Sequence, residues 1–308
     1  MKYSIEGFPE AYRYSLIDTD SYPLPTVPFS EMGLLAALPN NFGAKKEWPW
    51  GIETSPKIYD KKKKWPKISI ITPSYNQGKY IEETIRAVLL QNYPNLEYIV
   101  IDGGSTDGTL DVLKKYSKWI SYWHSKPDKG QGHAINLGFS LSSGEYQGWI
   151  NSDDYYSNGS LFRLGMEILK SKKDFYYGDA LEINEDGSLR NYWKANLVLD
   201  KYYAFGGLIA SHSAFWKREI HQPIWELMNC NVDGELWGRL LTGKKKKHIK
   251  FPIGVCRHQP DAKSISESWK QKWAEDDRNI HAKYGKPKKS VYLNYEFYYL
   301  QRIYKLLR

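Results

Sequence analysis

At residues 68–76 the chain reads Ile68-Ser69-Ile70-Ile71-Thr72-Pro73-Ser74-Tyr75-Asn76, a short apolar run that ends in a polar turn. Its length and its isoleucines predict a buried strand that stops at Thr72-Pro73. The following segment carries Glu82 and Glu83 where the first turn of a helix favours negative charge, and apolar residues at helical spacing come next. The organised part of the fold therefore begins here, with a strand, a loop and a helix in that order.

The same alternation continues along the chain. Leu96–Ile101 predicts a second strand, and Leu110–Tyr116 predicts the next helix. A further helix over Ala134–Leu141 and a strand over Tyr146–Ile150 extend the pattern. Strands that alternate with helices predict an α/β fold, here a Rossmann-like, mainly parallel sheet flanked by helices. Ligands then belong at the carboxyl ends of the strands.

Different composition marks the two ends of the chain. Residues 1–66 are rich in proline and aromatic side chains without a helix or strand period, so we expect an irregular N-terminal arm. We place the catalytic domain at residues 67–260. Residues 261–308 are expected to form a helical carboxyl-terminal extension, with a long helix over Ser266–Tyr284.

Composition limits the partners and the compartment. The chain of 308 residues carries a formal net charge of +9, which favours anionic partners such as nucleotide phosphates or anionic lipids. The basic tracts at Lys61–Lys64 and Lys244–Lys247 accompany no nucleic-acid motif, so we expect no nucleic-acid partner. Two cysteines, Cys230 and Cys256, lack the spacing of a zinc site or a disulfide scaffold. With no signal peptide or membrane-spanning run, we expect a cytoplasmic location.

Three polar segments follow predicted strands: Thr72 to Asn76, Asp102 to Ser105, and Asn151 to Asp154. Parallel strands would bring them to one edge of the sheet. Adjacent carboxylates there, Asp153 and Asp154, can supply oxygen ligands for magnesium or manganese beside a diphosphate. The alternative is that the Asp-Asp pair only caps a helix near Ser160, and the shared edge favours the metal over the cap.

The turn that follows the second strand allows two interpretations. Asp102 could accept hydrogen bonds from a nucleobase or ribose, or it could organise the glycine-rich turn Gly103-Gly104-Ser105. The turn is not a dinucleotide-binding fingerprint. The chain also lacks the Gly-x-x-x-x-Gly-Lys-Ser/Thr loop of P-loop phosphotransferases.

Taken together, the motifs resemble those of the family 2 inverting glycosyltransferases over about residues 67–260. The order and spacing of four segments carry the resemblance: Ile70 to Asn76, Asp102 to Thr109, Asp128-Lys129-Gly130-Gln131, and Asn151 to Asp154. The resemblance implies a GT-A fold and a metal, Mn²⁺ or Mg²⁺, held by Asp154, Asp153 and His258. The donor-binding residues it implies are Thr72, Pro73, Tyr75, Asn76, Asp102, Asp128, Gln131, Asn151 and Asp153.

The catalytic base is expected in a later acidic segment. Val232-Asp233-Gly234-Glu235-Leu236-Trp237 resembles the segment in which a family carboxylate deprotonates the acceptor hydroxyl. Asp233 is our first candidate and Glu235 its rival, while either acid could instead cap a helix and complement its dipole. For His258 the alternative is an ordinary structural histidine.

The expected function is transfer of a sugar from a nucleotide diphosphate sugar to a glycan or lipid-linked acceptor, as in surface polysaccharide synthesis. The alternative is a non-catalytic module that binds a nucleotide sugar or a glycan. The tail from Tyr292 to Arg308 has an apolar stripe of Tyr295, Tyr299, Ile303 and Leu306 beside basic residues. This stripe could rest on the inner face of the plasma membrane as a peripheral contact, or pack on the catalytic domain, which we favour.

Overall fold

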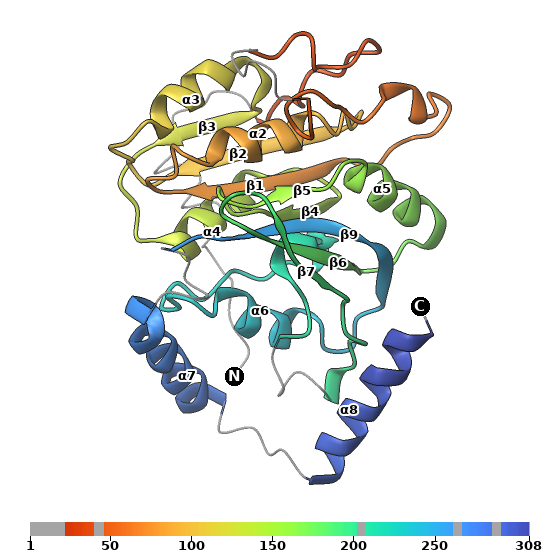
Figure 1. Ribbon diagram of the computed structural model, residues 1–308, viewed down its shortest axis with the longest axis vertical. Helices are drawn as coiled ribbons and strands as arrows, with labels where there is room; N and C mark the ends of the chain where they lie inside the picture. The colour runs from red at the N-terminus through yellow and green to blue at the C-terminus, as the bar shows by residue number, and fades with distance from the viewer. Residues whose placement is uncertain (1–21, 40–45, 202–206, 261–266, 285–290, 308) are drawn as a thin grey trace.

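A mixed nine-stranded sheet forms the centre of the computed structural model, which describes residues 22–39, 46–201, 207–260, 267–284 and 291–307 (Figure 1). Its strand order is β3-β2-β1-β4-β8-β6-β9-β5, and β7 pairs with β6. The strands are β1 (Ile68–Ser74), β2 (Leu96–Asp102), β3 (Tyr122–Ser125), β4 (Tyr146–Trp149), β5 (Tyr155–Tyr156), β6 (Phe175–Asn184), β7 (Leu189–Trp193), β8 (Ala214–Lys217) and β9 (Lys246–His258).

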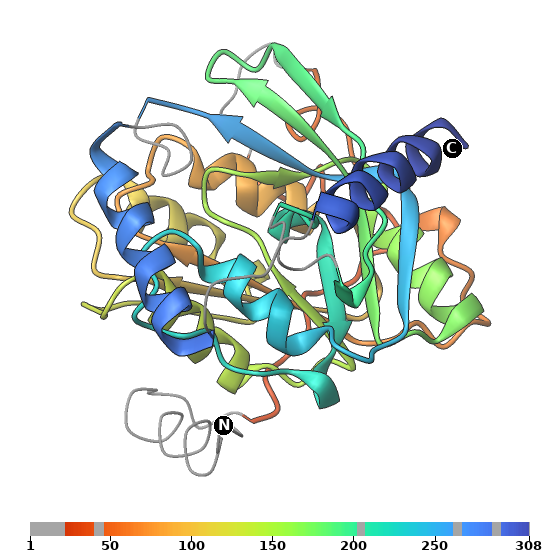
Figure 2. The same ribbon diagram turned by 90° about the horizontal axis from the view of Figure 1, so that it is seen from below.

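Helices cover both faces of the sheet, and α6, α7 and α8 lie on the side that faces the viewer in Figure 2. The helices are α2 (Ile81–Leu89), α3 (Thr109–Tyr116), α4 (Gln131–Leu141), α5 (Ser160–Ser171), α6 (Val232–Leu240), α7 (Lys270–Tyr284) and α8 (Val291–Leu306). Single 3-10 turns are η1 (Pro56–Ile58), η2 (Ser117–Trp119), η4 (Ser211–Ser213), η5 (Arg218–Ile220) and η6 (Glu267–Trp269).

The first half of the chain confirms the predicted alternation of strands and helices. β1 pairs in parallel with β2 and with β4, and β2 pairs in parallel with β3. In this register Ser74 lies beside Asp102, and Asp102 lies beside Ser125. Both β1 and β2 are buried along their whole length, as strands covered on two faces must be. The fold class expected from the sequence is therefore confirmed.

Two hydrophobic layers form because successive residues of β1 point to opposite faces. Ile68 and Ile70 pack with α2, α3 and α5 on one face. Ile71 packs on the other face with residues of α4 and α6. The amphipathic helices α2 and α5 bury their apolar stripes in this way, and polar side chains remain at the strand ends.

The second half of the sheet reverses direction. β8 is antiparallel to both β4 and β6, while β9 runs parallel to β6. The two-residue strand β5 pairs antiparallel with β9, with Tyr155 opposite Val255. This last pairing returns the carboxyl-terminal end of β9 to the loop that carries Asp153 and Asp154.

The described part of the segment before β1 has only the short 3-10 turn η1 and is packed on the core. Leu34 and Leu38 are buried against the cluster that contains α2. The guanidinium of Arg86, almost fully buried in α2, donates to the carbonyls of Pro49 and Trp50 at 3.0 Å. These bonds satisfy backbone groups of a segment that has no regular structure of its own.

The structure corrects our expectation for the carboxyl-terminal stripe. Tyr295, Tyr299 and Leu306 are 75%, 67% and 74% exposed, so these three residues do not pack on the catalytic domain, and only Ile303 of the stripe is half-buried. A different face of α8 makes that contact, through Phe297 and through Gln301, which exchanges hydrogen bonds with the backbone of residue 197. Ser266, the expected start of the preceding helix, lies outside the described residues, and α7 begins at Lys270. No helix in the described ranges is long and apolar enough to cross a membrane.

Candidate functional site

The first two predicted loops form one hydrogen-bonded unit at the carboxyl edge of the parallel strands. The Gly103 amide donates to the Ser74 carbonyl at 2.9 Å. The Asn76 amide donates to Ser105 Oγ at 2.8 Å, and the Thr106 amide donates to Asn76 Oδ1 at 2.9 Å. Asn76 itself adopts a left-handed φ of 51°, a conformation that asparagine tolerates better than most residues. The two loops therefore hold each other in place.

Asp102 lies inside this unit and is fully buried. Its carboxylate accepts hydrogen bonds from the Ser105 amide at 2.9 Å, from Ser105 Oγ at 2.5 Å and from Ser125 Oγ at 2.6 Å. Of the two interpretations left open by the sequence, these contacts favour the organising role in the turn. A contact with a nucleoside stays a prediction.

The strand end before this unit divides into buried and accessible residues. Thr72 and Pro73 are buried, and Thr72 Oγ1 lies 3.2 Å from the Tyr98 hydroxyl inside the core. Tyr75 is 62% exposed and Asn76 is also exposed. Among the predicted donor-binding residues of this loop, the two exposed ones are the side chains that a ligand can reach without rearrangement.

A chain of side-chain hydrogen bonds joins the segment at Asp128 to the paired acids. Asp128 Oδ1 accepts a hydrogen bond from the Gly130 amide at 2.7 Å. Gly130 has a φ of 107°, a backbone conformation that residues other than glycine rarely adopt. Gln131 then begins α4, and its Nε2 donates to Asn151 Oδ1 at 2.8 Å. Asn151 Nδ2 donates to Asp154 Oδ2 at 3.2 Å. The structure thus brings together Gln131, Asn151 and Asp154, which the sequence placed in two separate motifs.

Asp153 and Asp154 are adjacent acids in a largely buried setting. Burial, and next the neighbouring Asp154 carboxylate, raise the pKa of Asp153 to about 7. Burial also raises the pKa of Asp154 to about 6. Gln259 Nε2 donates to Asp153 at 2.7 Å, and the Arg257 amide donates to Asp154 at 3.0 Å. Two carboxylates in such a place are unfavourable as a pair of anions unless a cation compensates them.

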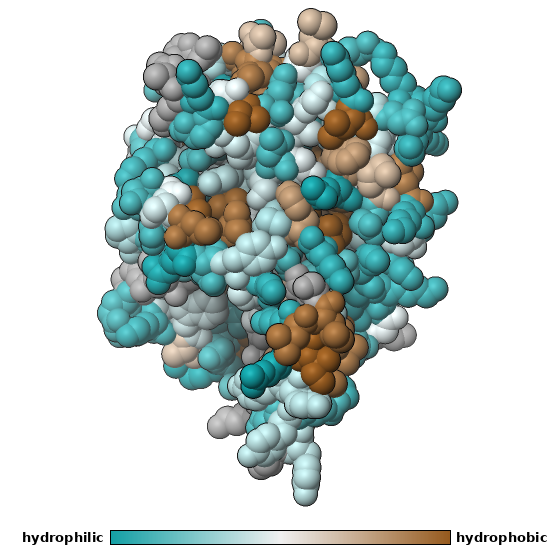
Figure 3. Space-filling view, turned by 45° about the vertical axis from the view of Figure 1, so that its right-hand side comes forward, coloured by the Kyte–Doolittle hydropathy of each residue, from teal (hydrophilic) through white to brown (hydrophobic). Residues whose placement is uncertain are grey.

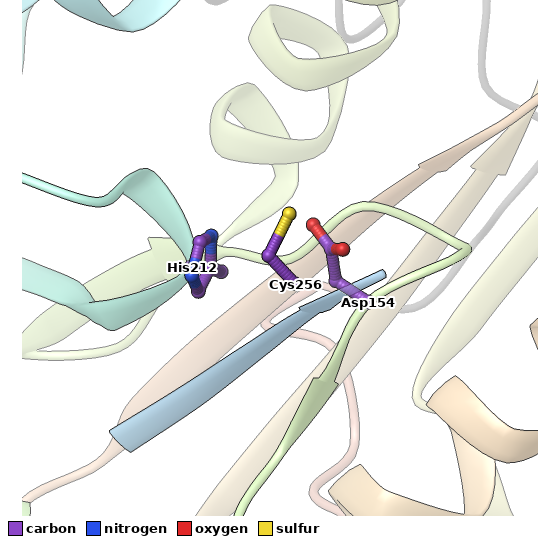
Figure 4. A group of neighbouring side chains, drawn as sticks. All are labelled: Asp154, His212 and Cys256. Atoms are coloured by element: carbon purple, nitrogen blue, oxygen red, sulfur yellow. The ribbon is translucent and has the colours of Figure 1, made fainter. Parts of the chain in front are cut away.

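The donor atoms beside Asp154 fit a divalent cation. Figure 4 shows Cys256 between His212 and Asp154, and each of the three residues offers a ligand atom within 4.8 Å of the others. His212 Nε2 is buried and has no hydrogen-bond partner among the described residues. An unpartnered buried nitrogen beside a carboxylate and a thiol is the arrangement that a metal ion would satisfy.

The sequence predicted a different third ligand. His258 Nε2 lies 3.5 Å from a carboxylate oxygen of Glu182, and neither His258 nor Asp153 belongs to the compact group around Asp154. Sequence reasoning missed His212 and set Cys256 aside because no metal-ligand spacing connects them along the chain. Only the pairing of β5 with β9 places Cys256 next to Asp154.

The helix that carries Asp233 is fixed to the same strand end. The Trp237 ring of α6 stacks on Trp149, the last residue of β4, with centroids 5.5 Å apart and an interplanar angle of 19°. The fully buried Asp276 of α7 accepts hydrogen bonds from the Cys230 and Asn231 amides just before α6. The strand that leads into Asp153 and Asp154 therefore also supports the start of α6.

The two candidate bases have different surroundings. Glu235 accepts two hydrogen bonds of 2.7 Å from Arg239 and one of 2.5 Å from the Tyr284 hydroxyl, and Lys283 lies 3.2 Å away. Burial works in the opposite direction, but these partners hold the pKa of Glu235 below its usual value. Asp233 accepts a hydrogen bond from the adjacent Gly234 amide at 2.9 Å, and burial raises its pKa. These contacts give Glu235 a structural role, and the role of Asp233 as the base stays a prediction.

Comparison with known sequences places this site in a family. Residues 69–236, more than half of the chain, match the family described as Glycosyl transferase family 2. An uncharacterized glycosyltransferase of Rickettsia felis is 38% identical over 138 residues, which cover 44% of this chain and 23% of that protein. The putative teichuronic acid biosynthesis glycosyltransferase TuaG of Bacillus subtilis is 38% identical over 99 residues, 31% of this chain and 39% of TuaG. The chain thus spans less than half the length of these relatives.

Solved structures share the fold. TarS 1–349 from S. aureus, in complex with UDP-GlcNAc, superposes with a TM-score of 0.56 at 18% identity, covering 70% of this chain and 66% of TarS. The mannosyltransferase PcManGT from Pyrobaculum calidifontis, in complex with GDP-Man and Mn²⁺, gives 0.51 at 17% identity, covering 74% and 69%. At these identities the likeness concerns the fold alone.

Because Asp153 and Asp154 are buried next to each other, the free energy of unfolding of the metal-free protein should depend on pH. Because the folded-state pKa of Asp153 lies above that of an unfolded aspartate, its contribution to stability is present at low pH and is lost as pH rises from about 4 to about 7. Asp153→Asn should therefore gain on the order of 4 kcal/mol of unfolding free energy relative to the wild type across that range. Urea unfolding in EDTA measures this, with the exposed Asp186→Asn as control. A constant difference between Asp153→Asn and the wild type would contradict the assignment.

Proposed function

Because the chain belongs to glycosyl transferase family 2, we propose that it transfers a sugar from a nucleotide diphosphate sugar to an acceptor hydroxyl with inversion at the anomeric carbon. One observation carries the proposal. Asp153 and Asp154 lie in a largely buried loop at the carboxyl edge of the parallel strands, and Asp154 is linked by hydrogen bonds through Asn151 to Gln131 of another donor-side motif. A diphosphate with its cation is the ligand that such an edge suits.

The donor would be held mainly by the loops at this edge. Tyr75 and Asn76 are the accessible side chains of the first loop, and Gln131 and Asn151 lie next to the paired acids. A divalent cation bound at Asp154 would neutralise the diphosphate and stabilise the charge that grows on it as the sugar departs. Asp153, with Gln259 on one oxygen, is placed to contact the ribose or the metal.

Asp233 would act as the general base. In an inverting displacement the acceptor oxygen attacks opposite the departing diphosphate while a carboxylate removes its proton. The raised pKa of Asp233 suits this task, because a base that is too acidic takes up a proton poorly. The attachment of α6 to β4 through Trp237 and Trp149 supports placing this carboxylate near the donor. No covalent enzyme intermediate is needed.

The names of related proteins support a direction for the substrate. UDP-GlcNAc and GDP-Man occur in the complexes of two structural neighbours, and TuaG is named for teichuronic acid biosynthesis. We therefore propose a glycan or lipid-linked acceptor in a surface polysaccharide pathway. The second candidate, a non-catalytic binding module, is less well supported because it gives no role to the available carboxylate of Asp233.

A peripheral membrane contact through α8 is the remaining part of this proposal. Its outward stripe exposes Tyr292, Tyr295, Tyr299 and Leu306, and Figure 3 shows a compact apolar patch low on the side of the molecule that carries this helix. A pocket of about 490 Å³ beneath α8 is lined by Lys244, Lys246, Lys247 and Lys250 together with Tyr304. Tyrosines beside lysines are typical of surfaces that bind anionic lipid headgroups.

The function itself is tested by donor turnover. UDP-, GDP-, dTDP- and CDP-sugars are screened for nucleotide release with and without divalent metal, and one of them should be hydrolysed in a metal-dependent way. Asp154→Asn should abolish most of this activity and weaken metal-dependent donor binding, because it removes a charged oxygen ligand. Asp186→Asn, an exposed carboxylate in the β6–β7 turn, should behave like the wild type. Binding without any turnover would support the binding module instead.

Asp233→Asn should separate chemistry from binding. Because a general base acts in the chemical step, we expect unchanged donor affinity and a transfer rate lower by about 100-fold or more. Glu235→Gln should instead lower the unfolding free energy by about 3 kcal/mol, since it removes the buried negative charge that pairs with Arg239. Calorimetric donor titration, transfer rates and thermal melts distinguish the two. If folded Glu235→Gln loses transfer while Asp233→Asn keeps it, the base must be reassigned.

Vesicle sedimentation tests the membrane contact. The full chain should sediment with vesicles containing anionic lipid, less so with neutral vesicles, and binding should weaken as salt rises. The triple variant Tyr295→Ser, Tyr299→Ser, Leu306→Ser should lose several-fold in binding without loss of stability, since all three side chains are exposed. Leu189→Ser, equally exposed on β7, is the control. Equal binding of the triple variant and the wild type would exclude α8 as the contact.

A further inference from the structure

We propose that the protein ligands of the catalytic metal are Asp154, His212 and Cys256, and that the sulfur ligand makes the site select a borderline cation such as Zn²⁺ or Co²⁺ over Mg²⁺. This rests on the proposed function, whose metal class it specifies. The observation behind it is one compact set of a carboxylate, an imidazole and a thiol, all with ligand atoms within 4.8 Å of one another.

Strand pairing brings two of the three ligands together. Tyr155 of β5 lies opposite Val255 of β9 in antiparallel register, so the residues just outside this pair, Asp154 and Cys256, also lie opposite each other. The Arg257 amide donates to Asp154 Oδ1 at 3.0 Å and fixes the carboxylate at this position. In Figure 4 the Cys256 sulfur points to the same side as the Asp154 carboxylate.

The third ligand reaches the strand because of a glycine. A Cβ on Gly254 would lie only 2.3 Å from the His212 carbonyl oxygen and 2.5 Å from the His212 ring, so η4 can dock on β9 only where that position lacks a side chain. The Gly254 amide also donates to Ser213 Oγ at 3.0 Å, and Ser213 Oγ donates to the Asp179 carbonyl at 2.9 Å. Residues 254 and 256 point to the same face of β9, which places the His212 ring beside the Cys256 thiol.

The ligand chemistry follows from the donor atoms. His212 Nε2 is buried without a partner among the described residues, a state that a metal bond would relieve. On metal binding the thiol of Cys256 gives its proton to solvent and binds as a thiolate. The neutral imidazole and the carboxylate bind without a change of charge. The three ligands then carry a total charge of −2, which balances the +2 of the cation. Three protein ligands leave an open position, which a diphosphate oxygen could take.

A sulfur ligand decides the metal preference. Mg²⁺ takes oxygen ligands almost entirely, whereas thiolate and imidazole favour Zn²⁺ and its spectroscopic substitute Co²⁺. A site made of Asp154, Asp153 and His258, as expected from the family resemblance, would lack this sulfur. The two ligand sets therefore differ in what a spectrum of the bound metal would show.

The experiment is a titration of the full chain with Co²⁺ alone, followed by absorption. A cysteine ligand gives a thiolate-to-cobalt charge-transfer band in the near ultraviolet. The wild type and Cys230→Ser should show it, and Cys256→Ser should not; these are the only two cysteines of the chain, so Cys230→Ser is a matched control. His212→Ala should weaken Co²⁺ binding at least about tenfold, while His258→Ala should bind as the wild type does.

The proposal is overturned if the band persists in Cys256→Ser, if it is absent from the wild type, or if His258→Ala rather than His212→Ala weakens binding. Alkylation of the wild-type protein is a second test that does not depend on the folding of a variant. Zn²⁺ or Cd²⁺ should slow the alkylation of Cys256 several-fold, and an unchanged rate would contradict the proposal. Failure of the proposed function looks different. It would leave the cobalt band intact with no nucleotide released from any donor, whereas failure of this inference leaves metal-dependent release without the band.

Discussion

The parallel register of β1 with β2 and β4 is the constraint on which the site depends. It sets Ser74 beside Asp102 and ends β4 at Trp149, so that three polar loops leave the sheet at one edge. A slip of one residue would turn every side chain of β1 to the opposite face, so that Ile68 and Ile70 would leave the hydrophobic cluster in which they pack. Burial of both faces therefore fixes the register, and the register fixes which loops meet. The position of the candidate site is therefore a consequence of core packing along these strands.

The return of β9 adds what the parallel half lacks. By pairing with β5 it brings the Arg257 amide and the Gln259 amide group to the two acids. These are neutral or backbone donors, and they only partly offset the burial of two adjacent carboxylates, as the raised pKa values of Asp153 and Asp154 show. The metal-free site is therefore short of positive charge. A cation bound there would add stability, because it would offset the repulsion between the two buried carboxylates.

Sequence predicted the local elements better than the long-range contacts. The strands at Ile68 and Leu96 and the loops after them follow from apolar runs and turn residues, which act over a few positions. His212 and Cys256 could not be found in this way, because η4 and the pairing of two distant strands bring them together. For Glu235 a signal was present: Arg239 follows at the i+4 position, where oppositely charged residues on a helix pair. The sequence also predicted the wrong packing face of α8. Its regularly spaced tyrosines resemble an apolar stripe, but Phe297 and Gln301 make the contact with the rest of the protein.

The two acids of the α6 segment show why burial alone does not identify a base. Glu235 is the more buried, yet Arg239, Lys283 and Tyr284 occupy its oxygens, so a proton taken from a substrate would have to displace strong partners. Asp233 accepts a hydrogen bond through Oδ1 from the Gly234 amide, and burial raises its pKa. The cluster around Glu235 ties α7 to α6, and Asp276 ties α7 to the residues before α6. The proposed role of Asp233 as the base thus depends on the contacts of Glu235, because Glu235 ties α7 to the helix that presents Asp233.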